Sequence, residues 1–275
     1  KNPGDSGLPT ELTWQLPAGL DAGDIAWPVP HKIAIGTLAN YGYEGTVLLP
    51  VPVTVTQTFA PGPLAKDVTV QLKASWLVCR KECIPEEGNF TLQLPIQSTT
   101  ALHSAAFDAA QKAQPQPLAQ PSAQQQAQVD GDALQVRVAG LPAALRGKTL
   151  DLFPETPEVL HNAADGTQQW EGDVWTARIP LAEQRSNSPS TLPVVLAERV
   201  QGSTPRPGYR ADLTVQGPWP AAAAKASVSP ALEAALKANA ALAGSGLPPA
   251  APSGASSLTL TAALLGALLG GLILN

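Results

Sequence analysis

Two cysteines, three residues apart, are the residues of this chain best suited to chemistry. Cys79 and Cys83 lie in the segment SWLVCRKECIPEEG, residues 75–88, and no other cysteine occurs among the 275 residues. Two thiols at this spacing can form a disulfide, exchange that bond with other thiols, or bind a soft ion such as Cu(I). The elements that position the two residues decide between these uses.

The spacing of the pair requires a turn before a disulfide can form. In a straight strand the two residues would lie roughly 13 Å apart, whereas the Cα atoms of a disulfide lie within about 7 Å. The chain must therefore turn within residues 80–82 for the sulfurs to meet. Closing so short a loop contributes about 2 kcal/mol at most, against about 4.7 kcal/mol for a loop of about 100 residues. Such a bond is poorly placed as a structural staple.

The pair alone leaves three functions open. Disulfide exchange needs a reactive thiolate, which the basic residues between the cysteines favour and Glu82 opposes. A purely structural disulfide is the usual role of a lone pair in an exported protein, and it would suit a membrane-tethered binding module. A Cu(I) carrier is the third alternative, although the chain has no methionine. We expect its three histidines, His31, His103 and His161, at ordinary surface positions.

The charge of the chain excludes one broad class of function. It contains 17 Lys and Arg residues against 22 Asp and Glu residues, with a pI near 5.2. The basic residues are scattered, so they form no positive patch for a polyanion. Nucleic acid is therefore not an expected partner.

A strand with one buried face is predicted directly before Cys79. From Val68 to Val78 the even positions are apolar, and polar residues stand at the odd positions except for Leu77. Continuing this alternation by one residue places Cys79 on the face that points away from the core. A thiol that points outward is accessible to other thiols.

Similar alternation recurs along the chain and predicts antiparallel β-sandwiches. It appears at residues 47–55 and 90–96, and then in a second group at 134–138, 150–152, 175–181, 192–196 and 209–215. We place the first sandwich at 1–110 and a second, cysteine-free sandwich at 129–220. Residues 111–128 are Gln, Pro and Ala with almost no large apolar residue, so we expect a linker there, entered through a short helix near 101–113.

The C-terminal part predicts a tether and a membrane segment. After a helix from about 230 to 243, the Gly, Pro, Ser and Ala residues up to 257 predict flexibility, so we treat 221–257 as helix and tether. Leu258 to Leu274 is free of charge and just long enough to cross a bilayer as a helix. We therefore expect 258–275 to be the start of a first transmembrane helix. A buried core helix is the alternative.

Five ordered segments resemble one known family. They are NPGDSGLPTELTW (2–14), WPVPHK (27–32), YGYEGTVLLPV (41–51), WLVCRKECIPEEG (76–88) and LLGALLGGLILN (264–275). Together they resemble the DsbD/ScsB family of membrane thiol:disulfide interchange proteins, in its amino-terminal periplasmic region. The resemblance covers the first predicted domain and the tail, and it implies an immunoglobulin-like sandwich. The full expectation is thus a mainly β fold with two immunoglobulin-like antiparallel β-sandwich domains, a short helical linker and the start of a transmembrane helix.

The resemblance also implies roles for particular residues. Cys79 and Cys83 would be the catalytic redox pair of a protein-disulfide reductase, with Cys83 as the interchange nucleophile and Cys79 as the resolving thiol. The segment NYGYEG (40–45) stands where the family has an aromatic cap loop, so Tyr41 and Tyr43 would shield the pair. Simple packing of both tyrosines in the sandwich is the alternative.

The partners follow from the same resemblance. Electrons would come from the thioredoxin-like and membrane domains of the same protein, and would pass to periplasmic thioredoxin-like or disulfide isomerase-like proteins. The chain would be held at the bacterial inner membrane with this region facing the periplasm. Its task would be electron transfer, as in cytochrome c biogenesis, isomerase recycling or metal-stress resistance. No organic cofactor and no metal is required in this portion.

Overall fold

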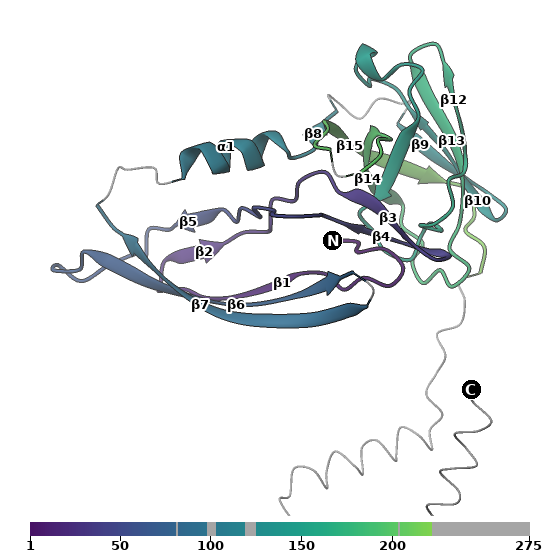
Figure 1. Cartoon of the computed structure of the whole chain (residues 1–275). Coiled ribbons are helices and arrows are strands. Elements are labelled where there is room, and N and C mark those ends of the chain that lie inside the picture. Colours follow the sequence, from purple (N-terminus) through teal and green to yellow (C-terminus); the bar gives the residue numbers. More distant parts are fainter. Residues whose placement is uncertain (81, 98–102, 119–124, 203, 222–275) are drawn as a thin grey trace, which may run out of the picture. The chain divides into compact units, whose positions relative to one another are not determined.

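The computed structural model describes residues 1–80, 82–97, 103–118, 125–202 and 204–221. This part of the chain folds mainly as β-strands, with one short α-helix, Ser104–Lys112 (α1), where the sequence predicted it (Figure 1). All of it belongs to one compact unit. The predicted class, mainly β, is confirmed.

Residues 1–97, which we call the first β region, contain three small antiparallel sheets. The largest has three strands in the order β1-β6-β7, with bounds Glu11–Gln15, Asp67–Cys79 and Cys83–Pro95. The other two sheets pair β2 (Leu20–Ala22) with β5 (Val53–Val55), and β3 (His31–Ile35) with β4 (Leu38–Gly42). The long strands β6 and β7 run side by side in Figure 1.

The alternation in β6 produces the predicted buried face in the middle of the strand, but not at its end, where Val78 is 47% exposed. Val70 and Ala74 are buried, whereas Gln71 and Lys73, on the opposite side of the strand, are exposed. β1 pairs with β6 only from Gln71 to Ser75. The last residues of β6 therefore extend beyond β1 and pair with β7 alone.

The strand expected at residues 47–55 is much shorter in the structure. Only Val53–Val55 forms a strand (β5), and Val47 is 39% exposed. Pro50 and Pro52 lack the backbone N–H that a β-ladder needs, so pairing begins after them. The prediction of one long strand was wrong for this reason.

Phe90 and Leu92 also differ from the prediction. Their strand, β7, forms as expected, but the two residues are 53% and 57% exposed. Alternation in a sequence shows which residues share a face, but not whether another layer covers that face. β7 is an edge strand of a three-stranded sheet, so its apolar face is less covered than that of β6.

Residues 126–221, which we call the second β region, carry most of the hydrophobic core. Seven strands form the order β11-β14-β15-β9-β10-β13-β12, and the short β8 (Gln116–Pro117) pairs with β15. Their bounds are Gln126–Asp130 (β9), Ala133–Val138 (β10), Leu150–Pro154 (β11), Thr167–Glu171 (β12), Val174–Pro180 (β13), Thr191–Glu198 (β14) and Gly208–Gln216 (β15). A 3₁₀ turn spans Ala143–Leu145.

The core of the second β region confirms the alternation read from its sequence. The side chains that face inward from four strands are at most 1% exposed, namely Leu134, Trp175, Leu192 and Leu213. β8 and the start of β9 fall inside the segment 111–128, which we expected to be a linker. The division of the chain into two separate sandwich domains stays a prediction.

The C-terminal expectations lie outside the described residues. These are the helix near 230–243, the tether up to 257 and the membrane segment 258–275. Within the ranges that the structure describes, no helix is both long and apolar enough to span a bilayer.

Candidate redox site

The two cysteines form a disulfide at the tip of the β6–β7 hairpin. β6 ends at Cys79 and β7 begins at Cys83, and the two residues lie directly opposite each other in the ladder. Their Cα atoms are 4.1 Å apart and their sulfurs are bonded. The backbone N–H of Arg80 donates to the carbonyl oxygen of Glu82 at 3.1 Å, within the turn between the strands. The chain therefore reverses direction between Cys79 and Cys83, as the spacing of the pair predicted.

The hairpin ladder holds the cysteines face to face. β6 and β7 each have 13 residues, and they pair in one continuous register from Asp67↔Pro95 to Cys79↔Cys83. The ion pair between Lys73 and Glu87, 3.0 Å long, links exposed side chains and adds little. Because backbone pairing already places the two residues opposite each other, the disulfide is not needed to bring them together.

The disulfide lies at an exposed, apolar tip. Cys79 and Cys83 are both exposed, as the alternation predicted for Cys79. Their neighbours Val78 and Ile84 pair across the hairpin and are 47% and 55% exposed. Exposed apolar side chains that lie next to one another are typical of a surface that contacts another protein.

A large cleft begins at this tip, and Cys79 forms part of its wall. Its volume is about 1220 Å³. Both β regions line it. The first contributes aromatic residues and one cysteine, among them Trp27, Tyr41, Tyr43, Trp76 and Cys79; the second contributes Phe153, Pro154, Glu155, Val195 and Arg210.

Tyr43, expected in the cap loop, packs against a tryptophan in the wall of the cleft. Its ring stacks on that of Trp27, with centroids 6.3 Å apart and planes 9° from parallel. Its hydroxyl donates to the carbonyl oxygen of Pro28 at 2.9 Å. Burial raises the pKa of this hydroxyl well above its usual value. Tyr43 is thus a neutral, fixed wall residue of the cleft that also contains Cys79.

Tyr41 lines the same cleft but contacts the second β region. Its hydroxyl donates to Asn162 Oδ1 at 3.0 Å, and its ring meets Phe153 edge-on with centroids 5.2 Å apart. Burial, and to a smaller degree the charge of Asp5, raise the pKa of Tyr41 above its usual range. These contacts give Tyr41 a role in joining the two β regions, and the cap role expected for it and Tyr43 stays a prediction.

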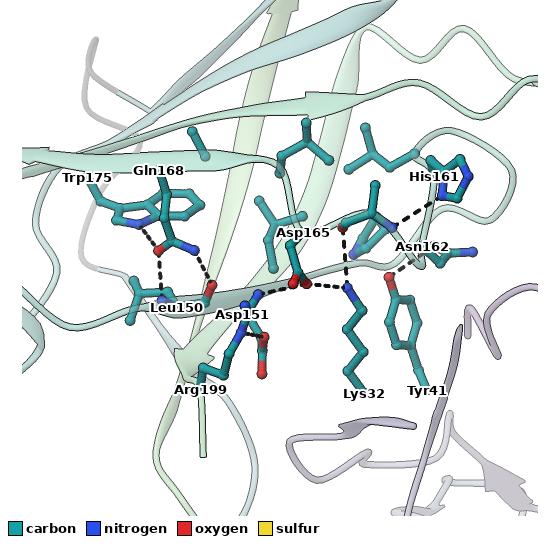
Figure 2. Close-up of a pocket in the computed structure, with 16 residues that line it drawn as sticks. Lys32, Tyr41, Leu150, Asp151, His161, Asn162, Asp165, Gln168, Trp175 and Arg199 are labelled. Carbon is teal, nitrogen blue, oxygen red and sulfur yellow. Dashed lines mark hydrogen bonds and ion pairs between the residues drawn. The ribbon is translucent and has the colours of Figure 1, made fainter. Parts of the chain in front are cut away.

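A polar cluster joins the two β regions around a small cavity (Figure 2). Lys32 of β3 pairs with Asp165 at 3.0 Å, and Arg199 bridges Asp165 at 3.1 Å and Asp151 at 2.7 Å. The hydrogen bond from Lys32 lowers the pKa of Asp165. The cavity, about 30 Å³, is large enough for one water molecule and too small for a substrate. This cluster is therefore a structural contact.

Arg206 is the most buried cation in this contact. Its side chain is 5% exposed and lies over the ring of Phe153, 5.8 Å from the centroid. It donates to His31 Nδ1 at 2.7 Å and to the carbonyl oxygen of Pro30 at 3.3 Å, and pairs with Asp151 at 3.4 Å. Burial first, and then the charge of Arg206, lower the pKa of His31. The expectation that all three histidines lie at ordinary surface positions was wrong for His31.

No motif in the sequence indicated that the second β region would contribute to the cleft. One signal was present in Leu150–Pro154, where the charged Asp151 interrupts an apolar strand. Asp151 is 6% exposed, and it pairs with Arg199 and Arg206. A buried carboxylate must have such partners, so its presence in an apolar strand indicates a charged contact.

Comparison with known proteins agrees with these observations. Residues 1–95 match the family model described as "Thiol:disulfide interchange protein DsbD, N-terminal". Among solved structures, the crystal structure of the N-terminal periplasmic domain of ScsB from Proteus mirabilis is similar, with a TM-score of 0.54 and 14% identity. That likeness covers 79% of this chain and 81% of the other, and at this identity it concerns the fold alone. No curated protein sequence matches the chain.

Proposed function

We propose that the chain is a thiol–disulfide exchange module acting through Cys79 and Cys83, because residues 1–95 match the family model of DsbD amino-terminal domains. One observation carries the proposal. Inside the segment that matches the family, the only two cysteines of the chain form an exposed disulfide at a hairpin tip. An exposed bond that closes a short loop contributes little to stability and is accessible to exchange.

The exchange proceeds by two displacements at sulfur. With the pair reduced, the thiolate of Cys83 attacks one sulfur of a partner's disulfide, and the partner's other sulfur leaves as a thiolate. The thiolate of Cys79 then attacks the Cys83 sulfur of this mixed disulfide and releases the partner's second thiol. Two electrons pass to the partner, which becomes a dithiol, and the Cys79–Cys83 bond forms. The module therefore acts as a protein-disulfide reductase.

The setting of the reaction is part of the proposal. The similar solved structure is a periplasmic domain, and it extends over both β regions of this chain. We therefore place the module in the periplasm, as two immunoglobulin-like domains attached to the inner membrane through residues 258–275. Thioredoxin-like and membrane domains of the same protein would supply the electrons. The acceptors would be periplasmic proteins with thioredoxin-like or isomerase-like folds.

Redox equilibration separates exchange from a structural disulfide. The chain is equilibrated in glutathione or dithiothreitol mixtures, and free thiols are trapped by alkylation. An exchange pair is expected above about −300 mV, the region below which structural disulfides of secreted proteins typically lie. A pair that stays oxidised below that potential would favour the tethered binding module instead.

Single-cysteine variants test the assigned order of attack. Cys79→Ser should accumulate a mixed disulfide through Cys83 with a disulfide-containing protein, because no resolving thiol remains. Cys83→Ser should accumulate less, and the double serine variant serves as the blank. A stronger mixed disulfide through Cys79 would reverse the assignment. Copper titration of the reduced chain, with Cys79→Ser as control, tests the carrier alternative.

A further inference from the structure

The second β region supplies one wall of the cleft in which Cys79 lies, and we propose that this wall binds the partner's polypeptide during exchange. The occupant is an uncharged, apolar chain segment that flanks the partner's reactive cysteine. This inference rests on the proposed function and deepens it, because it gives the cysteine-free half of the molecule a part in recognising partners.

The position of the cleft identifies what can enter it. Cys79 and its strand neighbours Trp76 and Val78 line one side, and Phe153 and Val195 of the second β region also line it. A partner sulfur that bonds to either cysteine must come to this end of the cleft. The residues that flank that sulfur in the partner then lie at the cleft mouth, beside both walls.

The size of the cleft favours a polypeptide over a small molecule. Pockets for small molecules usually measure about 300–1,000 Å³. The cleft measures about 1220 Å³, and several of the apolar side chains that line it are exposed to solvent. These are Leu8, Ile35, Val47 and Val78, which are 39–59% exposed. Apolar exposure of this kind marks a protein interaction surface.

The charges in the wall of the second β region are already paired. Glu155 accepts from Lys1 at 2.9 Å and from Arg210 at 3.0 Å, and Arg210 also pairs with Asp212 at 3.0 Å. Burial alone would raise the pKa of Glu155, but the hydrogen bonds from Arg210 and Lys1 outweigh it and lower that pKa. Because these charges neutralise one another, this wall does not favour an acidic or a basic segment. An apolar, uncharged segment fits it best.

The wall is held firmly against the first β region. Arg206 donates to Pro30 and His31, and Tyr41 packs on Phe153. At Gly208 of β15 the approach is so close that a Cβ atom would lie 2.5 Å from Val29 Cγ2. Packing, rather than a flexible linker, therefore holds this wall against residues 29–41 of the first β region.

Two disulfide probes separate wall binding from chemistry at the tip. The first is an uncharged apolar decapeptide whose single cysteine is linked to thionitrobenzoate, and the second is glutathione linked in the same way. The reduced 275-residue chain attacks the peptide or glutathione sulfur and releases the coloured thionitrobenzoate thiolate. Cys79 then displaces the peptide or glutathione thiol, so each probe is reduced to two thiols.

Arg210→Ala removes a wall side chain that does not belong to the hairpin. It should slow release from the apolar peptide about tenfold, an effect that only a minority of interface side chains show on truncation, and change release from glutathione less than about twofold. Arg178→Ala is the matched control, because Arg178 is also a paired, partly exposed arginine of the same sheet and does not line the cleft. It should leave both rates unchanged.

A second measurement does not use Arg210→Ala and so does not depend on how that variant folds. The Cys79→Ser chain is joined to the apolar peptide through Cys83, and amide hydrogen exchange is compared with the free chain. Added protection is expected at residues 153–155 and 194–196 as well as at the hairpin. A decapeptide with flanking lysines or glutamates should react more slowly than the apolar one.

The outcomes distinguish the inference from the function beneath it. Suppose that the wild-type chain reacts with both probes, that Arg210→Ala and Arg178→Ala release thionitrobenzoate from the apolar peptide at the same rate, and that protection is confined to the hairpin. The wall then has no part in binding, and the exchange function stands. If wild-type chain reacts with neither probe, the proposed function itself fails.

Discussion

Opening the Cys79–Cys83 bond should lower the free energy of unfolding by about 2 kcal/mol at most. The bond joins residues four apart, so it closes a loop of five residues. The chain-entropy relation for a loop of that size gives roughly 7 cal/mol/K, or about 2 kcal/mol at 25 °C. The β6–β7 ladder already holds the two backbones together, so the folded state loses little else when the bond opens.

The same quantity fixes how folding changes the redox potential. If the disulfide stabilises the fold by about 2 kcal/mol, the fold must stabilise the disulfide by the same amount. For a two-electron couple this corresponds to about 45 mV. The potential of the pair in the folded chain should therefore lie about 45 mV below that of the same pair in the unfolded chain.

Both values can be measured on one protein. Urea unfolding of the oxidised chain is compared with that of the chain in excess dithiothreitol, and the potential is measured with and without urea. The Cys79→Ser/Cys83→Ser variant should unfold like the reduced chain. A loss above about 4 kcal/mol, typical of a staple that closes a loop of about 100 residues, would refute the reasoning.

Two substitutions test the contact between the β regions. Tyr41→Phe removes the hydrogen bond to Asn162 Oδ1 and should lower the free energy of unfolding by about 1–2 kcal/mol. The reduction potential of the Cys79–Cys83 pair should stay the same. A changed potential would show that the contact between the β regions influences the hairpin tip. His31 has a pKa below its usual 6.5 in the folded chain. Its contribution to the free energy of unfolding is therefore present above pH 6.5 and lost as the pH falls through the lowered pKa. His31→Gln keeps a hydrogen-bond acceptor for Arg206, and it should make the melting temperature depend less on pH between about pH 7.5 and 5.5. An unchanged pH dependence would show that another group titrates in this range.

The sequence predicted the elements that carry the cysteines well, for a physical reason. In the middle of β6 the alternation is regular, and each residue's burial depends there mainly on which side of the strand it occupies. Val70 and Ala74 are buried as expected. In β7 the same kind of alternation gave the strand but not the burial of Phe90, because burial there depends on covering layers far away in sequence.

The contact between the β regions could not be predicted from local pattern. Arg206 is separated from Pro30 by more than half of the chain, and no spacing connects them. Arg206 belongs to no recognisable motif, and the segment WPVPHK that contains Pro30 gives no sign of its partner. Only the fold brings β3 and β4 against β11 and β14, and with them the second wall of the cleft.

The in-register pairing of β6 and β7 constrains how the module chooses its reaction partners. Because the backbone of the hairpin is fixed by its own ladder, making or breaking the sulfur bond reorients two side chains and leaves the surrounding surface as it was. In the proposed exchange, an electron donor and an electron acceptor would then meet nearly the same hairpin surface. The direction of electron flow would follow from the difference in reduction potential between them.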